Sequence, residues 1–283
     1  MDVSTFTAHR RLLASGAGDI AYTEIGTGPA ALFVHGAGTS GVLWRNVIEA
    51  LADTSRCVAI DLPGHGGTPP RDDESVPAMA EMVEELCAGL GLDQVDLVGN
   101  DTGGAVCQVF AARHPQRLRS LALTNCDTDG NFPPPEFAPI VELARQGKLA
   151  PAMVALAGDP AAWRTSPLAG LYEDPDAVPD EVWLDYIIPI GGTLDRARAF
   201  ERLLAAFDPA DLAAATPGLR ALTAPALLVW GTAEPSFAVK WAYQLRDTLP
   251  GARDVIEVDG AKLFFPEERP GDLIPHLRTF WSR

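Results

Sequence analysis

The sequence predicts an α/β protein with a mostly parallel sheet, flanked by helices and interrupted once by a helical block. In residues 1–126, short apolar runs that suit buried strands alternate with segments of helical periodicity. Between residues 127 and 217 the alternation stops, and helical segments and prolines dominate. It returns from residue 218 onward. This order is typical of a parallel sheet with helices on both faces and one insertion.

Strands and helices are expected to alternate in the first part of the chain. The expected strands are Ala21–Glu24, Ala30–His35, Cys57–Leu62, Gln94–Gly99 and Ser120–Asn125. Helices are expected at Val42–Leu51, Met79–Leu90 and Gly104–Arg113. A Pro/Gly-rich stretch, Pro63–Pro70, indicates a loop after the third of these strands.

The rest of the chain divides into a helical block and a second α/β part. The best helix candidates in the block are Val141–Arg145, Glu181–Ile188 and Arg196–Phe207. Later elements are expected at Ala226–Trp230, Val239–Thr248, Asp254–Val258 and Asp272–Trp281. We therefore expect a core domain of residues 1–126 and 218–283, and a helical cap of residues 127–217. Such a cap covers the carboxyl ends of the strands, where open α/β sheets bind ligands.

Charge and composition exclude several classes of function. The net charge of −16 disfavours nucleic acid and anionic lipid, which bind clustered Lys and Arg. The sequence shows neither a long apolar run for a membrane span nor the apolar region of a signal peptide. Four scattered cysteines and the absence of phosphate-loop, dinucleotide or metal-ligand motifs predict no metal and no cofactor. We expect a cytoplasmic protein whose partner is a small organic substrate; a homodimer stays open.

A turn between a strand and a helix carries the main candidate residue. The strand Val95–Val98 runs into Gly99-Asn100-Asp101-Thr102-Gly103-Gly104, and a helix follows. The glycines at 99 and 103 permit a sharp turn from which Asp101 projects over the start of the helix. The free N–H groups and the dipole of that helix stabilise a negative charge. The alternative is a tight turn in which Asp101 only caps the helix.

With this turn, the chain resembles the α/β-hydrolase superfamily, in the branch of haloalkane dehalogenases and epoxide hydrolases that use an aspartate at the nucleophile elbow. Further motifs follow in the family's order: His35-Gly36-Ala37-Gly38, Asp61-Leu62-Pro63-Gly64-His65-Gly66, Leu227-Leu228-Val229-Trp230-Gly231 and Pro266-Glu267-Glu268-Arg269-Pro270. The resemblance covers essentially the whole chain. It implies the α/β-hydrolase fold, with a mostly parallel eight-stranded sheet and an inserted helical cap.

The resemblance breaks at the catalytic histidine. It implies Glu234 as the triad acid, and a histidine three residues before Pro266. That position holds Leu263, and Lys262 beside it points the other way on an extended segment. The other histidines do not obviously replace it. In the family, this histidine activates the water that hydrolyses an ester formed on the aspartate, so the ordinary hydrolytic route lacks its base.

The resemblance and the strand order together predict the site. The expected catalytic residues are Asp101 and Glu234. The expected oxyanion-hole and substrate-binding residues are His35, Gly36, Ala37, Thr102, Leu263, Asp127, Tyr186 and Trp183. Thr102 and Ala37 stand where haloalkane dehalogenases usually hold halide with Trp and Asn. Epoxide hydrolases rely on cap tyrosines; Tyr172 and Tyr186 lie in the expected cap and could take that role, and packing is the favoured alternative for both. Asp127 and Asp129 follow a strand end; their alternative role is in the loop itself.

Three functions remain open from the sequence. The first is an enzyme that uses Asp101 as acid or base in a non-hydrolytic reaction (isomerisation, epimerisation, elimination or cyclisation), because paired carboxyls in an apolar pocket split their pKa values. The second is a hydrolase of the haloalkane dehalogenase or epoxide hydrolase type, with Asp101 as nucleophile and an unrecognised base. The third is a catalytically inactive protein that binds a small molecule.

Overall fold

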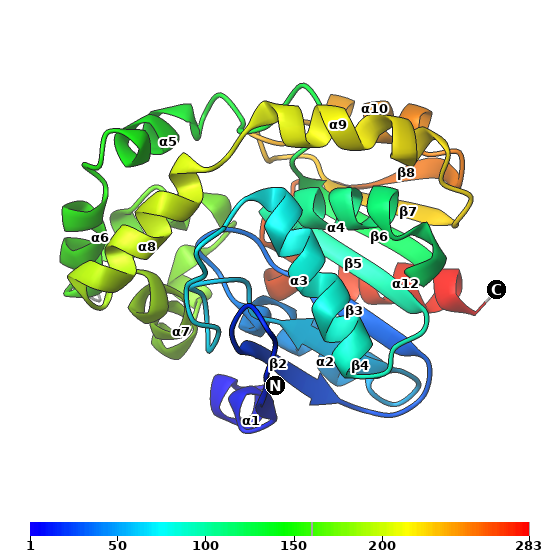
Figure 1. Ribbon diagram of the computed structural model, residues 1–283, viewed down its shortest axis with the longest axis horizontal. Coiled ribbons are helices and arrows are strands. Elements are labelled where there is room, and N and C mark those ends of the chain that lie inside the picture. The colour runs from blue at the N-terminus through cyan, green and yellow to red at the C-terminus, as the bar shows by residue number, and fades with distance from the viewer. Residues whose placement is uncertain (160, 283) are drawn as a thin grey trace.

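A computed structural model describes residues 1–159 and 161–282, which form one sheet with helices on both faces (Figure 1). The strands are β1 (Arg10–Leu13), β2 (Ile20–Ile25), β3 (Ala30–Val34), β4 (Arg56–Ile60), β5 (Val95–Asp101), β6 (Leu118–Cys126), β7 (Ala226–Gly231) and β8 (Ala252–Val258). Their order in the sheet is β1-β2-β4-β3-β5-β6-β7-β8. β1, β2 and β4 pair antiparallel, and the strands from β4 to β8 pair parallel. The predicted fold class is confirmed.

The central strands lie where the sequence has its most apolar runs. Every residue of β3 and β5 is buried, because both strands are covered by helices on both faces. The edge strand β1 was not expected from the sequence. Its four residues include two arginines and stay half-buried or exposed, so they lack the apolar pattern that identifies an inner strand.

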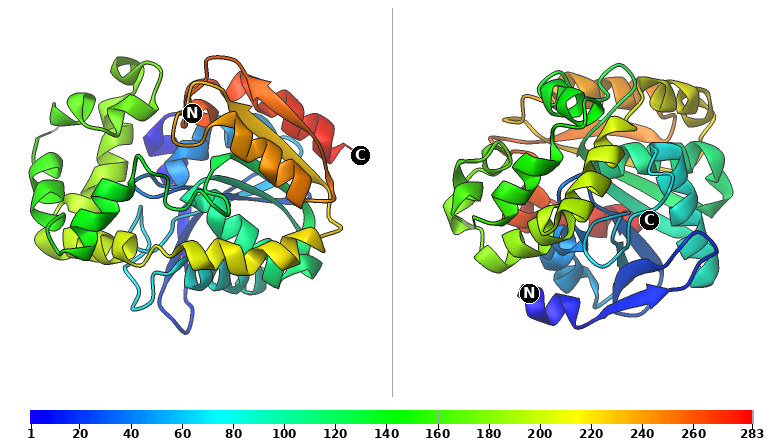
Figure 2. Two further views of the ribbon diagram at one scale, coloured as in Figure 1. Left: turned by 90° about the horizontal axis from the view of Figure 1, so that it is seen from above. Right: turned by 60° about the vertical axis from the view of Figure 1, so that its left-hand side comes forward.

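Two sets of helices cover the sheet. α3 (Val76–Gly89), α4 (Thr102–Arg113), α9 (Pro209–Arg220) and α10 (Val239–Thr248) pack along one face, and α2 (Arg45–Leu51) and α12 (Ile274–Trp281) pack together on the other (Figure 2). Short α1 (Val3–Thr7) and α11 (Phe265–Glu268) flank them. In the described part of the chain, no helix combines the length and the hydropathy needed to cross a membrane.

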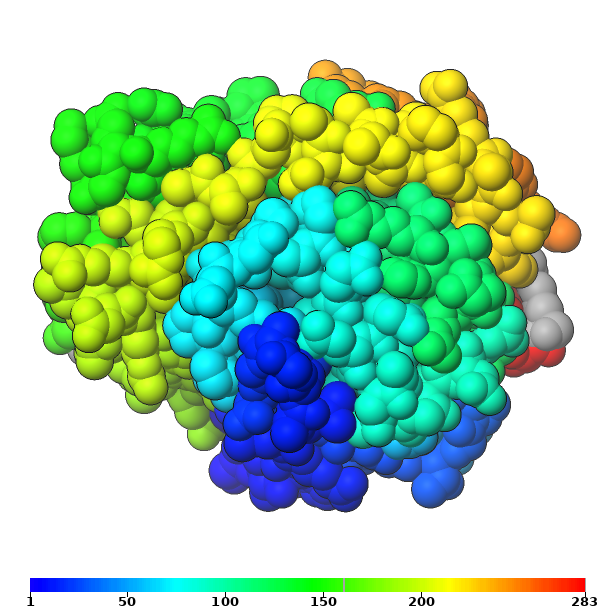
Figure 3. Space-filling model, viewed as in Figure 1, coloured from blue at the N-terminus to red at the C-terminus, as the bar shows by residue number. Residues whose placement is uncertain are grey.

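The remaining α-helices gather on one side of the molecule, at the left of Figure 1, next to the carboxyl ends of the parallel strands. They are α5 (Ala138–Arg145), α6 (Ala150–Ala157), α7 (Asp180–Gly191) and α8 (Leu194–Ala205). Figure 3 shows α8 lying directly against the segment of residues 60–80, where the Phe200 and His65 rings are 5.6 Å apart. The predicted cap limit at residue 217 falls inside α9, which packs on α4 of the core. We call the helices α5 to α8, with the segments that flank and join them, the cap; the division of the chain into two domains at residues 126 and 217 stays a prediction.

A buried polar cluster joins these helices to the core. Glu267 lies on the short helix α11 and pairs with Arg45 of α2. The hydroxyl groups of Tyr172 and Tyr186 both donate to Oε2 of Glu267, at 2.8 and 3.0 Å. Burial, with the Glu267 charge beside them, raises the pKa of both phenols well above 10. The tyrosines are therefore protonated donors in a satisfied network.

Candidate active site

The predicted catalytic residues meet at the carboxyl ends of neighbouring parallel strands. Asp101 is the last residue of β5, and its Cα is in register with that of Cys126 at the end of β6. Asp127 follows Cys126 directly, and Glu234 follows β7. Because parallel strands end at one edge of a sheet, this connectivity brings three carboxyl groups from three segments to one place.

The turn at Asp101 has the geometry of a nucleophile elbow. Asp101 has φ 55° and ψ −136°, and it is the one non-glycine residue with positive φ in residues 1–159 and 161–282. Such backbone costs roughly 1–3 kcal/mol and persists where packing enforces it. A Cβ on Gly103 would lie 2.3 Å from the His35 carbonyl oxygen, and one on Gly104 would lie 2.3 Å from Cβ of Cys126. Glycines thus allow α4 to start tightly against β3 and β6.

Two buried histidines fix the loop that faces Asp101. The His35 ring binds the Gly36 carbonyl through Nδ1 (2.8 Å) and accepts the Leu62 N–H at Nε2 (2.9 Å). His65 accepts the Gly38 N–H at Nε2 (3.0 Å). Burial lowers the pKa of His35 well below its usual value, and that of His65 to about 4. Both rings are neutral and hold backbone.

Gly36 lets this loop approach the aspartate closely. A Cβ at Gly36 would lie 2.1 Å from Oδ2 of Asp101, so only glycine leaves room for the carboxyl group. Burial raises the pKa of Asp101 to about 7, and the nearby Glu234 charge adds to the rise. The backbone N–H groups of Thr102 and Ala37 act in the opposite direction, by hydrogen bonding to the carboxylate. Of the residues predicted for the oxyanion hole and substrate binding, Ala37 and Thr102 are therefore the two whose N–H groups act on Asp101 itself.

Asp127 is the second carboxyl group beside the elbow. Gln108 Nε2 donates to its backbone carbonyl at 2.7 Å and fixes the start of the loop. Its side chain is buried, and Oδ1 has no hydrogen-bond partner among the described residues. Burial raises the pKa of Asp127 well above the usual value, the Asp101 charge raises it further, and the Thr102 hydroxyl opposes the rise. Asp127 thus holds a proton when Asp101 is ionised.

Asp129, two residues on, faces elsewhere. Its Oδ2 accepts a hydrogen bond from Thr216 Oγ1 at 2.8 Å, and its backbone carbonyl accepts one from Gln244. Of the two aspartates in this loop, Asp127 is therefore the one beside Asp101.

The position expected for the triad histidine holds a fully buried leucine. Asn100 Nδ2 donates to the Leu263 carbonyl at 3.1 Å. Burial raises the pKa of Glu234, whereas Ser236, the Leu263 N–H and the Lys262 charge lower it. Oε1 of Glu234 accepts the Ser236 N–H at 3.0 Å, whereas Oε2 has no hydrogen-bond partner in the described part of the chain. Glu234 thus lies close to the Leu263 backbone, and the leucine side chain at this position cannot transfer a proton.

The neighbouring cation is engaged elsewhere. Lys262 Nζ donates to the carbonyl oxygens of Gly170 and Tyr172, at 3.0 and 2.8 Å, and so ties the segment to the cap. The three remaining histidines have local partners or lie far from the elbow. His9 binds the Thr5 carbonyl, His114 lies beside Glu81, and His276 lies on α12.

A small cavity lies between the elbow and the cap. Its volume is about 50 Å³, well below the ~300–1,000 Å³ of typical ligand pockets. Asp101, Thr102, Asp127 and Ala37 contribute its core side. The cap side is apolar and includes Pro133, Phe137, Ile140, Val141, Leu204 and Phe207. The helical periodicity of α5 and α8 indicates which side chains point inward, but the sequence does not reveal that these two helices face Asp101.

Two cap residues predicted to bind substrate have other neighbours. Tyr186 donates to Glu267, as described above. Trp183 stacks on Trp163, with ring centroids 4.9 Å apart and planes 17° from parallel. Neither residue is part of the wall of the cavity at Asp101. Their contribution to substrate binding stays a prediction.

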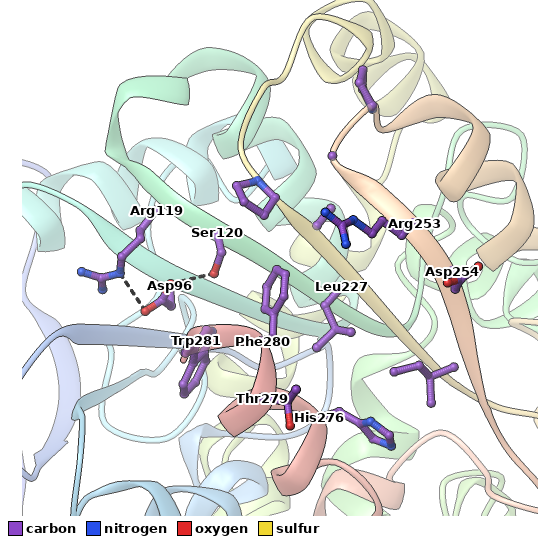
Figure 4. A pocket seen from close by; sticks show the side chains of 15 residues that line it. Asp96, Arg119, Ser120, Leu227, Arg253, Asp254, His276, Thr279, Phe280 and Trp281 are labelled. Atoms are coloured by element: carbon purple, nitrogen blue, oxygen red, sulfur yellow. Dashed lines mark hydrogen bonds and ion pairs between the residues drawn. The ribbon is translucent and has the colours of Figure 1, made fainter. Parts of the chain in front are cut away.

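A larger cavity of about 840 Å³ lies at the opposite end of the strands, beside α12 (Figure 4). Asp96 at the start of β5 accepts hydrogen bonds there from Ser120 (2.6 Å) and from Arg119 Nε (2.9 Å). These polar groups satisfy one another. The smaller cavity is therefore the candidate active site, because its carboxyl groups lack such partners.

Comparisons with known proteins agree with this architecture. The model of the α/β-hydrolase fold family matches residues 29–269. An uncharacterised protein of Mycobacterium tuberculosis is 38% identical over 106 residues, which are 37% of this chain and 31% of that protein. The alignment thus spans about a third of that relative's length. Haloalkane dehalogenase 2 of M. tuberculosis is 28% identical over 286 residues, covering 95% of this chain and 93% of the relative.

Solved structures show the same fold. The haloalkane dehalogenase DbeA from Bradyrhizobium elkani superposes with a TM-score of 0.82 at 24% identity, over 96% of this chain and 97% of that one. A membrane phospholipase A described as a bacterial virulence factor superposes with a TM-score of 0.72 at 24% identity, over 96% and 85% of the two chains. Since proteins of different activity share the fold, the activity has to be argued from the site.

Proposed function

Because the chain belongs to the α/β-hydrolase fold family, we propose that it is an enzyme whose Asp101 carboxylate attacks a carbon atom of a small apolar substrate. In that step, an electron pair of a carboxylate oxygen forms a C–O bond while the bond from the same carbon to the leaving group breaks. The leaving group departs with the bonding electrons, and the substrate remains as an ester of Asp101. The elbow, the cavity and the similarity to a haloalkane dehalogenase support this proposal.

The observation that carries the proposal is the elbow itself, whose positive-φ backbone and close approach to Gly36 present the Asp101 carboxyl group to the cavity. The backbone N–H groups of Ala37 and Thr102 act on this carboxyl group and lower its pKa. In the proposed reaction they hold the nucleophile before attack. Once the carboxylate has become an ester, the same donors face the ester and stabilise the negative charge that develops when water adds to it. A nucleophile and an oxyanion hole acting on one group suit covalent catalysis by Asp101.

The non-hydrolytic acid–base reaction is the second candidate, favoured by the buried Leu263 at the histidine position. A carboxyl group with a pKa of about 7 is well matched to proton abstraction near neutral pH. In that reaction, however, the negative charge develops on the substrate. The N–H groups that would receive it already act on the Asp101 carboxyl group. For this reason we rank acid–base chemistry behind nucleophilic attack.

Intact-protein mass spectrometry tests the proposal. The protein is incubated with 1-bromopropane or 1,2-epoxypropane, and both the protein mass and the released bromide or diol are recorded. We expect an adduct or steady product release with the wild type, and neither with Asp101→Asn. Asp129→Asn serves as a matched control, because Asp129 binds Thr216 rather than lining the cavity. If the wild type gives neither adduct nor product, Asp101 is not a nucleophile towards these carbons. Solvent-deuterium exchange into small ketones then tests the acid–base alternative, and its absence would favour the inactive binding protein.

A further inference from the structure

Asp127 has no task in the step described above, although it shares the cavity with Asp101. The strand register places it one residue beyond the partner of Asp101, and Gln108 fixes its backbone. Its Oδ1 atom is buried and has no hydrogen-bond partner in residues 1–159 and 161–282. A buried polar atom without a partner costs about 1–3 kcal/mol, so its presence beside a nucleophile calls for an explanation.

The surroundings of the two aspartates distribute the proton between them. The backbone N–H groups of Ala37 and Thr102 favour the ionised form of Asp101, and the Thr102 hydroxyl acts on Asp127 in the same sense. Burial and the Asp101 charge raise the pKa of Asp127, so Asp127 keeps its proton when Asp101 is ionised. The reactive pair is therefore an Asp101 carboxylate beside an Asp127 carboxylic acid.

Most of the other titratable groups near the elbow hold other partners, and Glu234, whose Oε2 also has no partner among the described residues, lies outside the cavity wall. The rings of His35 and His65 hold backbone groups, and Lys262 holds cap carbonyls. Glu234 binds the Ser236 N–H and lies beside Leu263, outside the cavity wall. Asp127 is left as the proton-transfer group that shares the cavity with the nucleophile.

We propose that Asp127 is the general acid and base that serves Asp101: it protonates the leaving oxygen of a small epoxide and then deprotonates the water that hydrolyses the ester. This role rests on the proposed function of Asp101 as nucleophile. It assigns to a carboxyl group on the neighbouring strand the task that the missing histidine would otherwise perform. A carboxyl pair that works first as nucleophile and acid, and then as ester and base, is chemically sufficient for hydrolysis.

The proton balance closes over one cycle. In the first step Asp101 forms a bond to a ring carbon, the ring C–O bond breaks, and the proton of Asp127 moves to the ring oxygen. In the second step the Asp127 carboxylate takes a proton from water as the hydroxide adds to the ester carbon of Asp101. The intermediate then expels the product alkoxide, which takes the proton of the re-formed Asp101 carboxylic acid. The products are a diol, the Asp101 carboxylate and the Asp127 carboxylic acid.

The cavity favours an oxygen leaving group over a halide. An alkoxide needs a proton as it leaves, and a carboxylic acid supplies one. The rest of the lining is apolar apart from Thr102, so there is no indole or amide donor in this described wall to hold a halide ion. A volume of about 50 Å³ limits the substrate to a few carbon atoms.

Two probes separate the roles of Asp127. Attack on 1-bromopropane needs no acid, so it isolates the base step, whereas 1,2-epoxypropane needs both steps. With bromopropane, we expect Asp127→Asn to release about one equivalent of bromide per protein and to retain a stable propyl ester on Asp101. With epoxypropane, we expect diol formation to fall about 10²–10⁴-fold. Asp129→Asn is the control, and tryptic mapping identifies the alkylated residue.

The outcomes distinguish this inference from the proposed function. Asp127→Asn could turn over both probes at the wild-type rate while Asp101→Asn turns over neither. This result overturns the role of Asp127 and leaves Asp101 as the nucleophile. A stable ester on Asp101 already in the wild type also overturns the role of Asp127, because no base then hydrolyses the ester. Release of bromide by Asp101→Asn, or no reaction in any variant, overturns the proposed function itself. The far-UV circular dichroism of each variant confirms that it is folded.

Discussion

Two groups of buried carboxylates lie at the boundary between the cap and the core, and they differ in their partners. Glu267 has an arginine, Arg45, and two tyrosine hydroxyls on its side chain. Backbone N–H groups act on Asp101 and Glu234, the hydroxyls of Thr102 and Ser236 act on Asp127 and Glu234, and none of the ion pairs among the described residues includes these three carboxyl groups.

This difference in partners shows that the Glu267 cluster stabilises the fold, whereas the Asp101 cluster is available for chemistry. A carboxylate paired with a cation and fully hydrogen-bonded holds its charge and its position. Burial without an ion pair raises the pKa of Asp101 to about 7 and that of Asp127 well above its usual value, so Asp101 exchanges a proton near neutral pH. Buried carboxyl groups therefore have two uses in this chain. The Glu267 cluster stabilises the contact between the cap and the core, and the Asp101 cluster forms the reactive site.

Introducing an imidazole into the acidic cluster should have the largest effect. In an Asp127→Asn background, Leu263→His places a base beside Glu234, whose Oε2 atom has no partner among the described residues. We expect hydrolysis of the propyl ester on Asp101 to accelerate by about 10²–10⁴-fold, measured as the decay of the adduct mass with time. Leu263→Phe, which fills the position without a proton-transfer group, is the control. An equal acceleration by both variants would show that repacking, not the imidazole, is responsible.

Removing Arg45, the cation of the Glu267 cluster, should have the next largest effect. It should lower the free energy of unfolding rather than a reaction rate. Arg45→Met keeps the length of the side chain but leaves the Glu267 carboxylate buried with the two tyrosines alone. We expect the free energy of unfolding to fall by about 3–5 kcal/mol in urea titrations. Asp247→Asn removes an exposed ion pair with Arg246 and should change it by at most about 1 kcal/mol. Similar losses for the two variants would contradict the contrast between the clusters.

Neutralising Asp101 should have a smaller effect on stability, and it should raise the free energy of unfolding rather than lower it. Its pKa rises from 3.8 to about 7 on folding, so the folded state favours the protonated form. The wild type therefore loses stability as the pH rises through the interval from about 4 to about 7. The full rise corresponds to at most ~4 kcal/mol, and we expect Asp101→Asn to gain about 2 kcal/mol at pH 8 and little at pH 4. Urea titrations at both pH values measure this gain; a gain that does not depend on pH would mean that burial of the charge is not its cause.

The inner elements of the fold were predictable from their apolar runs. The expected strand Ala30–His35 corresponds to β3 (Ala30–Val34), and the expected helix Val239–Thr248 has the bounds of α10. The missed elements are those that are short or poorly patterned. β1 pairs with β2 alone, and α6 begins with Ala150 and Pro151 and has a weakly amphipathic sequence. Both owe their conformation to tertiary packing rather than to local periodicity.

The site was predictable only where chain order fixes position. Asp101, Glu234 and Leu263 lie at the ends of strands or just after them, so motif spacing was enough to bring them to one edge of the sheet. Tyr186 and Trp183 lie on a cap helix, and the sequence does not state which face of that helix meets the core. The structure turns one towards Glu267 and stacks the other on Trp163.

The sequence by itself determined the sheet, the glycine-lined elbow and the presence of Leu263 at the position expected for a catalytic histidine. Each depends on residue type and on spacing along the chain, which strand pairing converts directly into position. Only the tertiary structure decided the protonation of the carboxyl groups and the partner of Asp101. Those depend on burial and on groups that other segments bring close: the Ala37 N–H acts on Asp101, and the Thr102 hydroxyl acts on Asp127 in the turn after β6. A pKa is a property of the surroundings in space, and these assemble only when the chain folds.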